Sequence, residues 1–194
     1  MAAVKRLCVY CGSSAHVDQA YRAAAMRLGE LLAEAGIELI YGGGRVGLMG
    51  VLADATLTAG GRVIGIIPGH LHDYEVGHTG LSELIVVGSM HERKRRMFEL
   101  ADAFAALPGG LGTLDETFEI ITWKQLALHD KPIVIVDVAG YWAPLRTLLH
   151  HVVTTGFATP RVLRHFSFVP GVEDLLPALA MTPPPTIPAE TKLV

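Results

Sequence analysis

Two charged residues fall at helix positions where the surrounding pattern calls for apolar side chains. Glu116 shares a predicted helix face with Ile120 and Trp123, so its carboxylate is directed inward. Arg93 lies on the apolar stripe of an earlier predicted helix, where an unpaired buried charge would cost on the order of 3–5 kcal/mol. Its partner could be Glu116 or a bound phosphate. An inward carboxylate can stabilise a developing cation or orient a water molecule, which makes both residues candidates for catalysis.

Both positions also have a purely structural interpretation. Thr113 and Glu116 have the spacing of a capping box, in which Glu116 would only accept a hydrogen bond from a backbone N–H group. Ser89 and Glu92 form a second such box, which predicts that the helix carrying Arg93 begins there. A basic run is usually a solvated helix face, and this interpretation fits the neighbours of Arg93 better than Arg93 itself.

Three glycine-containing loops, each after a predicted strand, could hold a phosphate. The first, at residues 11–14, offers the hydroxyl group of Ser13. The second, at 42–47, matches G-x-G-x-x-G, and Gly43 and Gly44 would let backbone N–H groups approach an anion closely. The third, at 107–113, opens a helix, whose dipole adds to the attraction for an anion. Each loop alone could be an ordinary turn, but their combination predicts a phosphate ligand.

The same region lacks the marks of larger cofactors. A dinucleotide site would place an acid about 20 residues beyond the glycine loop, and the next strand ends instead in Ile66, Ile67 and Pro68. The chain has no G-x-x-x-x-G-K-[ST] motif, which disfavours triphosphate and magnesium chemistry. The histidines of the long loop after residue 68 fit no zinc signature. We therefore expect no cofactor and no metal ion.

Seven apolar runs predict strands, and most are continuous, as in parallel strands covered on both faces. They cover residues 5–11, 38–41, 62–67, 83–87, 103–107, 132–137 and 166–169. Helical patterns cover residues 18–35, 48–59, 90–101, 113–128 and 141–154, with a short one near 172–179. This alternation predicts an α/β fold, a doubly wound, mostly parallel Rossmann-like sheet with helices on both faces. Gly36 and Gly60 stand where C-terminal helix caps belong. The ligand crevice is expected at the carboxyl ends of the strands.

We expect a single nucleotide-binding domain over residues 1–181 and a Pro-rich, flexible tail over 182–194. The net charge of −3 creates no general positive field, so nucleic acid is not an expected partner. No run approaches the roughly 20 apolar residues of a membrane span, and no signal pattern opens the chain. We therefore expect a cytoplasmic protein that does not bind membranes. Cys8 and Cys11 have C-x-x-C spacing, but residues three apart in a strand point to opposite faces, which favours a structural role.

Three motifs together resemble those of the LONELY GUY (LOG) family, whose members have often been labelled lysine decarboxylases. Residues 108–116 are similar to the family's P-G-G-x-G-T-x-x-E signature. Residues 90–94 are similar to its M-H-x-R-K element, and residues 42–50 to its first glycine loop. The resemblance extends from about residue 4 to 157, in the family's order and spacing.

The resemblance implies a Rossmann-like fold, commonly in a homodimer. It also implies hydrolysis of the N-glycosidic bond of cytokinin riboside 5′-monophosphates or AMP, to free base and ribose 5-phosphate. Arg93 and Glu116 correspond by position to the family's catalytic pair. The positions that correspond to substrate contacts are Glu75, Lys94, Gly110, Leu111, Gly112, Thr113, Leu114, Asp115 and Thr122.

Some positions depart from the family pattern, and two other functions remain open. Asp115 stands where many relatives have glutamate, and Gly88 where many have an acid, which could alter base preference. The same loops could serve a non-catalytic AMP-binding protein. A pyridoxal-phosphate decarboxylase would need a lysine for a Schiff base, for which Lys94 and Lys124 are the interior candidates.

Overall fold

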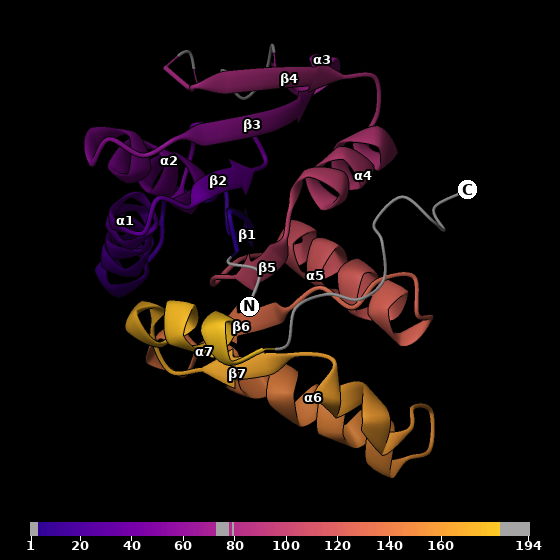
Figure 1. Ribbon diagram of the computed structural model, residues 1–194. Coiled ribbons are helices and arrows are strands. Elements are labelled where there is room, and N and C mark those ends of the chain that lie inside the picture. Colours follow the sequence, from indigo (N-terminus) through magenta and orange to yellow (C-terminus); the bar gives the residue numbers. More distant parts are fainter. Residues whose placement is uncertain (1–3, 73–77, 79, 183–194) are drawn as a thin grey trace.

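The computed structural model describes residues 4–72, 78 and 80–182, and its strands form one seven-stranded sheet (Figure 1). The strands are β1 Arg6–Tyr10, β2 Glu38–Tyr41, β3 Val63–Pro68, β4 Glu83–Val87, β5 Ala103–Ala106, β6 Ile133–Val136 and β7 Ser167–Val169. Their order is β4-β3-β2-β1-β5-β6-β7, and every pairing between them is parallel. The doubly wound α/β fold is therefore confirmed, and the sheet is parallel throughout rather than mostly parallel. The tail predicted at 182–194 lies beyond the described residues, apart from Thr182.

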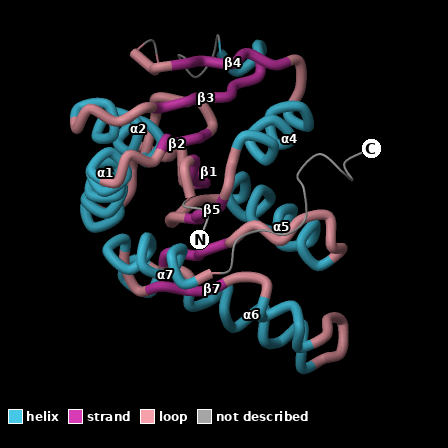
Figure 2. Tube along the Cα trace, in the orientation of Figure 1, coloured by secondary structure: helices cyan, strands magenta, loops and turns pink. Residues whose placement is uncertain are grey.

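Helices cover both faces of this sheet (Figure 1). They are α1 Gln19–Glu34, α2 Leu48–Thr58, α3 Gly69–His72, α4 Met90–Leu100, α5 Leu111–Gln125, α6 Ala143–Thr154 and α7 Leu175–Met181. Short 3₁₀ segments lie at Val138–Gly140, Pro160–Arg164 and Val172–Asp174. Helices α1, α2 and α7 lie against one face and α4, α5 and α6 against the other, with the strands as a single layer between them (Figure 2). None of the helices in the described part of the chain is long and apolar enough to cross a bilayer.

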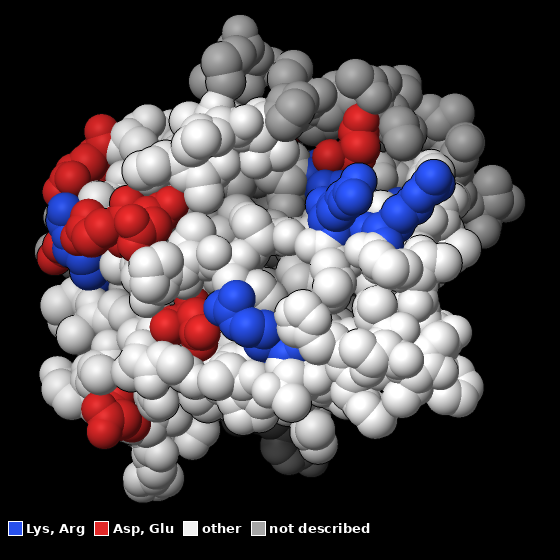
Figure 3. Space-filling model, turned by 90° about the horizontal axis from the view of Figure 1, so that it is seen from below, with Lys and Arg blue, Asp and Glu red and all other residues white. Residues whose placement is uncertain are grey.

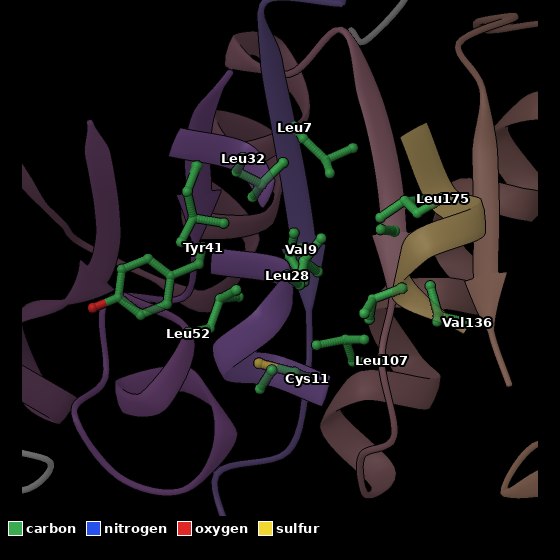
Figure 4. Packing of buried hydrophobic residues seen from close by; sticks show 14 of the residues in the cluster. Leu7, Val9, Cys11, Leu28, Leu32, Tyr41, Leu52, Leu107, Val136 and Leu175 are labelled. Carbon is green, nitrogen blue, oxygen red and sulfur yellow. The ribbon is translucent and has the colours of Figure 1, made fainter. Parts of the chain in front are cut away.

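Alternating side chains of β1 enter two different cores, one on each face of the sheet. Leu7, Val9 and the following Cys11 pack against the layer of α1, α2 and α7 (Figure 4). Cys8 and Tyr10 pack on the opposite side, with the layer of α4, α5 and α6. The continuous apolar runs of the sequence thus arise because helices cover the central strands on both faces of the sheet. The two cysteines are buried, unbridged and on opposite faces, as predicted.

Helix ends confirm most of the predicted caps and correct one. Gly36 and Gly60 follow α1 and α2 with φ of 65° and 81°, the left-handed geometry of a C-terminal cap. Ser89 caps α4 by accepting a hydrogen bond from the Glu92 N–H group at 3.1 Å. The capping box predicted at Thr113 was wrong. Helix α5 begins at Leu111 after a glycine cap, so Thr113 already lies inside the first turn.

The chain order of the strands changes direction beside β1. From β1 the chain adds β2, β3 and β4 towards one edge, then returns to place β5, β6 and β7 on the other side. In open parallel sheets the loops that follow the strands on either side of such a switch point diverge and leave a crevice. The loops after β1 and β5 are two of the three glycine loops, so the fold places them at this crevice.

Candidate active site

Backbone hydrogen bonds tie the three glycine loops to one another. The Gly12 N–H group donates to the Pro108 carbonyl at 3.1 Å, and the Leu48 N–H group donates to the Gly12 carbonyl at 2.9 Å. Gly47 has φ of 70°, and a Cβ atom there would overlap the backbone of Ser13 and Ser14. Glycine is therefore required at position 47 for both its conformation and its close contact. The loops after β1, β2 and β5 form one connected backbone platform.

The third loop presents the start of α5 to the crevice. Gly110 is the N-cap, and its position offers no side chain to bind the first N–H groups of the helix. Those N–H groups have no partner within a helix, so they remain available to an anion. Gly109 is closely packed, because a Cβ atom there would overlap the side chain of Thr113. Position 110 is open, with no atom within 4 Å of an added Cβ.

A cavity of about 260 Å³ opens at these loops, at the carboxyl ends of the strands. Its polar wall includes Ser13, Gly110, Gly112, Thr113 and the pair Arg93 and Glu116. Its other lining residues are Val9, Tyr10, Cys11, Gly12, Gly42, Met49, Leu71, Met90, Met97 and Leu111. The lining thus combines polar groups suited to an anion with apolar side chains suited to an apolar group.

The guanidinium group of Arg93 is fixed by three acceptors from three different elements. Its Nη1 lies 3.0 Å from Oε1 of Glu116 on α5. Its Nε donates to the Ile66 carbonyl of β3 at 3.1 Å, and its Nη2 donates to the Gly42 carbonyl after β2 at 3.4 Å. Only 12% of the Arg93 side chain is exposed. This arrangement gives the buried arginine the anionic partner that its position required, and it holds the Glu116 carboxylate at the cavity wall.

Burial dominates the electrostatics of Glu116. Its side chain is only 9% exposed, and loss of hydration raises the pKa of this carboxyl above its ordinary value. The charge of Arg93 opposes this effect, while Asp115 adds to it. A raised pKa, a partner charge and a cavity wall together are the properties expected of a carboxyl group that acts on a ligand.

Lys94 makes a second bridge between α4 and α5, outside the cavity. Its Nζ lies 3.1 Å from Oδ2 of Asp115 and 3.1 Å from Oε1 of Glu119. Burial lowers the pKa of the Lys94 ammonium, but its hydrogen bonds to Glu119 and Asp115 outweigh that effect and leave the pKa raised. Lys94 therefore stays charged, and it links the helices that carry Arg93 and Glu116.

Some of the predicted site residues line the cavity and others do not. Arg93, Glu116, Ser13 and residues 110–113 line one cavity. The other predicted positions that the structure describes do not line it; they are Gly43, Gly44, Lys94, Leu114, Asp115 and Thr122. Gly43 and Gly44 are buried within the second loop, and Thr122 lies exposed on α5, where its hydroxyl donates to the Phe118 carbonyl at 2.7 Å. Glu75 lies outside the described residues.

Sequence reasoning did not select the apolar lining of the cavity. Met49 comes from the start of α2, Leu71 from α3, and Met90 and Met97 from one stripe of α4. The regular spacing of the methionines on α4 is the signal that was available, but such a stripe usually indicates only a packed helix face. Leu71 could not have been found, because α3 has four residues and no usable periodicity.

Positive charge is local rather than continuous on the face of the molecule seen in Figure 3. On the face seen in Figure 3, Lys and Arg residues gather in small separate groups next to acidic residues, without a continuous positive surface. Within the site, the charges of Arg93 and Glu116 form a buried pair. The groups left to bind a small anionic ligand include the N–H groups at the start of α5.

Proteins of known fold resemble the chain over most of its length. The molybdenum cofactor carrier protein of Chlamydomonas reinhardtii matches with a TM-score of 0.69 and 20% identity, over 90% of this chain and 95% of that one. The molybdenum cofactor binding protein of Rippkaea orientalis matches with a TM-score of 0.69 and 21% identity, over 93% and 98% of the two chains. At this level of identity the likeness shows the fold alone.

Sequence comparisons are closer. A family model described as "Possible lysine decarboxylase" matches residues 49–179. The chain is 44% identical to the probable cytokinin riboside 5′-monophosphate phosphoribohydrolase LOGL5 of Oryza sativa subsp. japonica, over 93% of this chain and 74% of that protein. It is 42% identical to the cytokinin riboside 5′-monophosphate phosphoribohydrolase LOG7 of Arabidopsis thaliana, over 98% of this chain and 88% of that protein. With these relatives and with the glycine loops and the Arg93–Glu116 pair in one cavity, the chain belongs to the LOG family of cytokinin riboside 5′-monophosphate phosphoribohydrolases.

Proposed function

We propose that this protein hydrolyses the N-glycosidic bond of purine nucleoside 5′-monophosphates, to free base and ribose 5-phosphate. The observation that carries the proposal is the buried ion pair of Arg93 and Glu116 in the wall of the cavity that residues 110–113 also line. The names of the curated relatives state the same activity for those proteins. Site and relatives therefore support one reaction.

Different residues of the site bind the substrate and act on the bond that is cleaved. Cleavage of an N-ribosyl bond builds positive charge on the ribose, as in other glycoside hydrolysis. The N–H groups at the start of α5 hold the 5′-phosphate, and this binding orients the ribose. The Glu116 carboxylate stabilises the cationic sugar and positions the attacking water. Arg93 keeps that carboxylate ionised and in place, a role supported by its three hydrogen bonds within the protein.

The apolar residues of the cavity lining are suited to the base. Met49, Leu71, Met90 and Met97 line it, and methionine adapts well to irregular apolar groups. A cytokinin-type base carries an apolar substituent on N6, which plain adenine lacks. We infer that the cytokinin nucleotide is the preferred substrate and that AMP is a poorer one.

Two other functions receive less support from the site. A non-catalytic AMP-binding protein needs the glycine loops, but its phosphate site does not call for a buried carboxylate such as Glu116. A pyridoxal-phosphate decarboxylase needs a lysine in the cavity, and no lysine among the described residues lines it. Lys94 is held by two carboxylates, and Lys124 donates to the Lys131 carbonyl at 2.8 Å.

We also infer that the active form is a homodimer. Leu111 lines the cavity and is 85% exposed, and Met90, also in the lining, is 37% exposed. Exposed apolar residues around a ligand site are typical of a surface that another protein covers. A second copy over this mouth would shield the base from water. Sedimentation of the purified protein should give twice the mass of one chain, and a single-chain mass would contradict the inference.

The function is tested by incubating the purified protein with a panel of nucleoside 5′-monophosphates and measuring free base by chromatography. The panel includes AMP, an N6-prenyl AMP and a pyrimidine monophosphate. We expect free base from the two purine nucleotides, faster from the prenylated one, and ribose 5-phosphate in equal amount. If nucleotides bind but no base is released, the protein is a carrier and the hydrolase proposal is wrong.

A further inference from the structure

Tyr141 makes a hydrogen bond to the phosphate-binding loop from outside the cavity. Its hydroxyl group donates to the Gly109 carbonyl at 2.7 Å, across 32 positions of the chain. Gly109 belongs to the loop that follows β5, whereas Tyr141 follows the neighbouring strand β6. Tyr141 is not among the residues that line the cavity. Tyr141 therefore contacts this loop without being part of the cavity wall.

This hydrogen bond fixes the orientation of one particular peptide unit. In a planar trans peptide the C=O and N–H groups point in opposite directions. The carbonyl of Gly109 shares its peptide with the N–H group of Gly110, the N-cap of α5 in the cavity wall. When the carbonyl points to Tyr141, the N–H group points away from Tyr141. Rotation of this unit would replace a donor for phosphate oxygens by a carbonyl oxygen that repels them.

The peptide between Gly109 and Gly110 is packed closely on its Gly109 side, against Thr113, but has little to restrain it on its Gly110 side. Glycine reaches both signs of φ readily, and here two glycines flank one peptide. Position 110 has no atom within 4 Å of an added Cβ, so no side chain packs against it on that side. Conformational freedom is thus high on the Gly110 side of a peptide that phosphate binding needs in one fixed orientation.

The backbone around Tyr141 is itself held in an unusual conformation. Ala139 has φ of 52° and Gly140 has φ of 73°, and the first of these is unfavourable for a residue with a side chain. The Asp137 carboxylate accepts a hydrogen bond from the Trp142 N–H group at 2.6 Å, which closes this turn. The rings of Trp142 and of Tyr21 on α1 pack edge-on against Tyr141, at 4.8 and 5.4 Å between centroids. The turn therefore delivers the hydroxyl in a defined position.

We propose that Tyr141 is a positioning residue, which locks the peptide between Gly109 and Gly110 with its N–H group towards the substrate phosphate. Tyr141 touches no reacting atom in this role, and it acts through the backbone of the loop. The inference rests on the proposed function only in taking this loop as the phosphate site. It adds that phosphate affinity depends on a residue about 30 positions beyond the glycine motif.

The test replaces Tyr141 by phenylalanine, which removes the hydroxyl and keeps the packed ring. Because one hydrogen bond is lost, the dissociation constant of ribose 5-phosphate, measured by calorimetry, should rise about three- to tenfold. The KM for the nucleotide should rise by a similar factor, while kcat stays within about twofold. Tyr21→Phe is the matched control, since it removes a hydroxyl from the ring packed on Tyr141 and should leave both constants unchanged.

Separate outcomes overturn the inference and the proposed function. If Tyr141→Phe binds ribose 5-phosphate as tightly as the wild type, Tyr141 does not position the loop, whatever the enzyme hydrolyses. A fall in kcat and in the unfolding midpoint without a change in phosphate affinity would show a merely structural role, which also contradicts the inference. If the wild type binds ribose 5-phosphate but releases no base from any nucleotide, only the proposed function is wrong.

Discussion

The guanidinium group of Arg93 occupies the space that a side chain at position 42 would fill. A Cβ atom on Gly42 would overlap Nη2 of Arg93 and would lie 3.3 Å from Sδ of Met49. The same Nη2 donates to the Gly42 carbonyl. The glycine loop after β2 therefore has a second role besides any approach to a ligand, because it makes room for the arginine that holds Glu116.

Gly42→Ala should impair both catalysis and stability. The added methyl group overlaps a buried guanidinium group that three acceptors hold, so we expect the free energy of unfolding to fall by about 1–3 kcal/mol. Displacement of Arg93 by about 1 Å misplaces Glu116, and kcat should fall about ten- to a hundredfold. Gly171→Ala is the control, since its Cβ would meet only an ordinary contact at 3.8 Å. Equal kcat in Gly42→Ala and wild type would show that the position of Arg93 does not matter.

The pH dependence of kcat/KM should report the burial of Glu116 in the free enzyme. Burial raises the pKa of this carboxyl above 4.5, and the reaction needs its ionised form. Activity is therefore retained above the raised pKa and is lost as the pH falls through it. The acidic limb of the kcat/KM profile should accordingly have its midpoint above 4.5. A kcat/KM that stays constant down to pH 4.5 would contradict an essential Glu116 carboxylate.

Removing the second bridge between α4 and α5 should reduce stability. Lys94→Met leaves Asp115 and Glu119 without their shared cation, and the Lys94 side chain is only 12% exposed. We expect a loss of about 1–2 kcal/mol in urea unfolding, between the values for exposed and fully buried pairs. Arg95→Met breaks the exposed pair with Glu99 and should cost less than about 0.5 kcal/mol. Equal effects of the two changes would mean that the Lys94 bridge contributes no more than a surface pair.

Lys131 should make stability depend on pH under alkaline conditions. Its side chain is buried against the Phe98 ring, with Nζ 2.7 Å from the Phe98 carbonyl, and burial lowers its pKa to about 8. Between pH 8 and 10.5 the unfolded chain binds the proton more tightly, so this residue makes stability rise with pH across that window.

The measurement for Lys131 compares the wild type with Lys131→Met in urea at pH 7.5 and pH 10. We expect the wild type to gain on the order of 2–3 kcal/mol relative to the variant between these pH values, at about 1.4 kcal/mol per unit of pKa shift. Because both proteins contain every other titrating group, the difference isolates Lys131. A constant difference between the two proteins would show that its pKa is not lowered.

The order of elements was predictable because most strands are buried on both faces. Strands β2 and β4 have the predicted bounds, and the other strands differ by one residue at one or both ends. Helix α5 begins two residues before the predicted start, because its cap Gly110 has no side chain to mark a boundary. The four-residue α3 and the 3₁₀ segment Pro160–Arg164 were not predicted, since such short segments show no period.

The residue types of the site could be predicted, but the hydrogen bonds that join them could not. Helical periodicity directed Arg93 and Glu116 inward, and the structure brings them within 3.0 Å. The bonds of Arg93 to the carbonyls of Ile66 and Gly42 span 27 and 51 positions and exist only once the strands are adjacent. For Lys94, sequence position alone did not predict whether the side chain lines the cavity. Lys94 directly follows Arg93, yet it bridges α4 and α5 outside the cavity.

The most direct test of the account is the turnover of Glu116→Gln with the best nucleotide from the substrate panel. Glutamine keeps the shape of the side chain and its contact with Arg93 but removes the negative charge that stabilises the cationic ribose. We predict that kcat falls about 10²-fold or more, while ribose 5-phosphate still binds with an affinity within about threefold of the wild type. Wild-type kcat in this variant would contradict the account, since hydrolysis would then not depend on the carboxylate at the centre of the site.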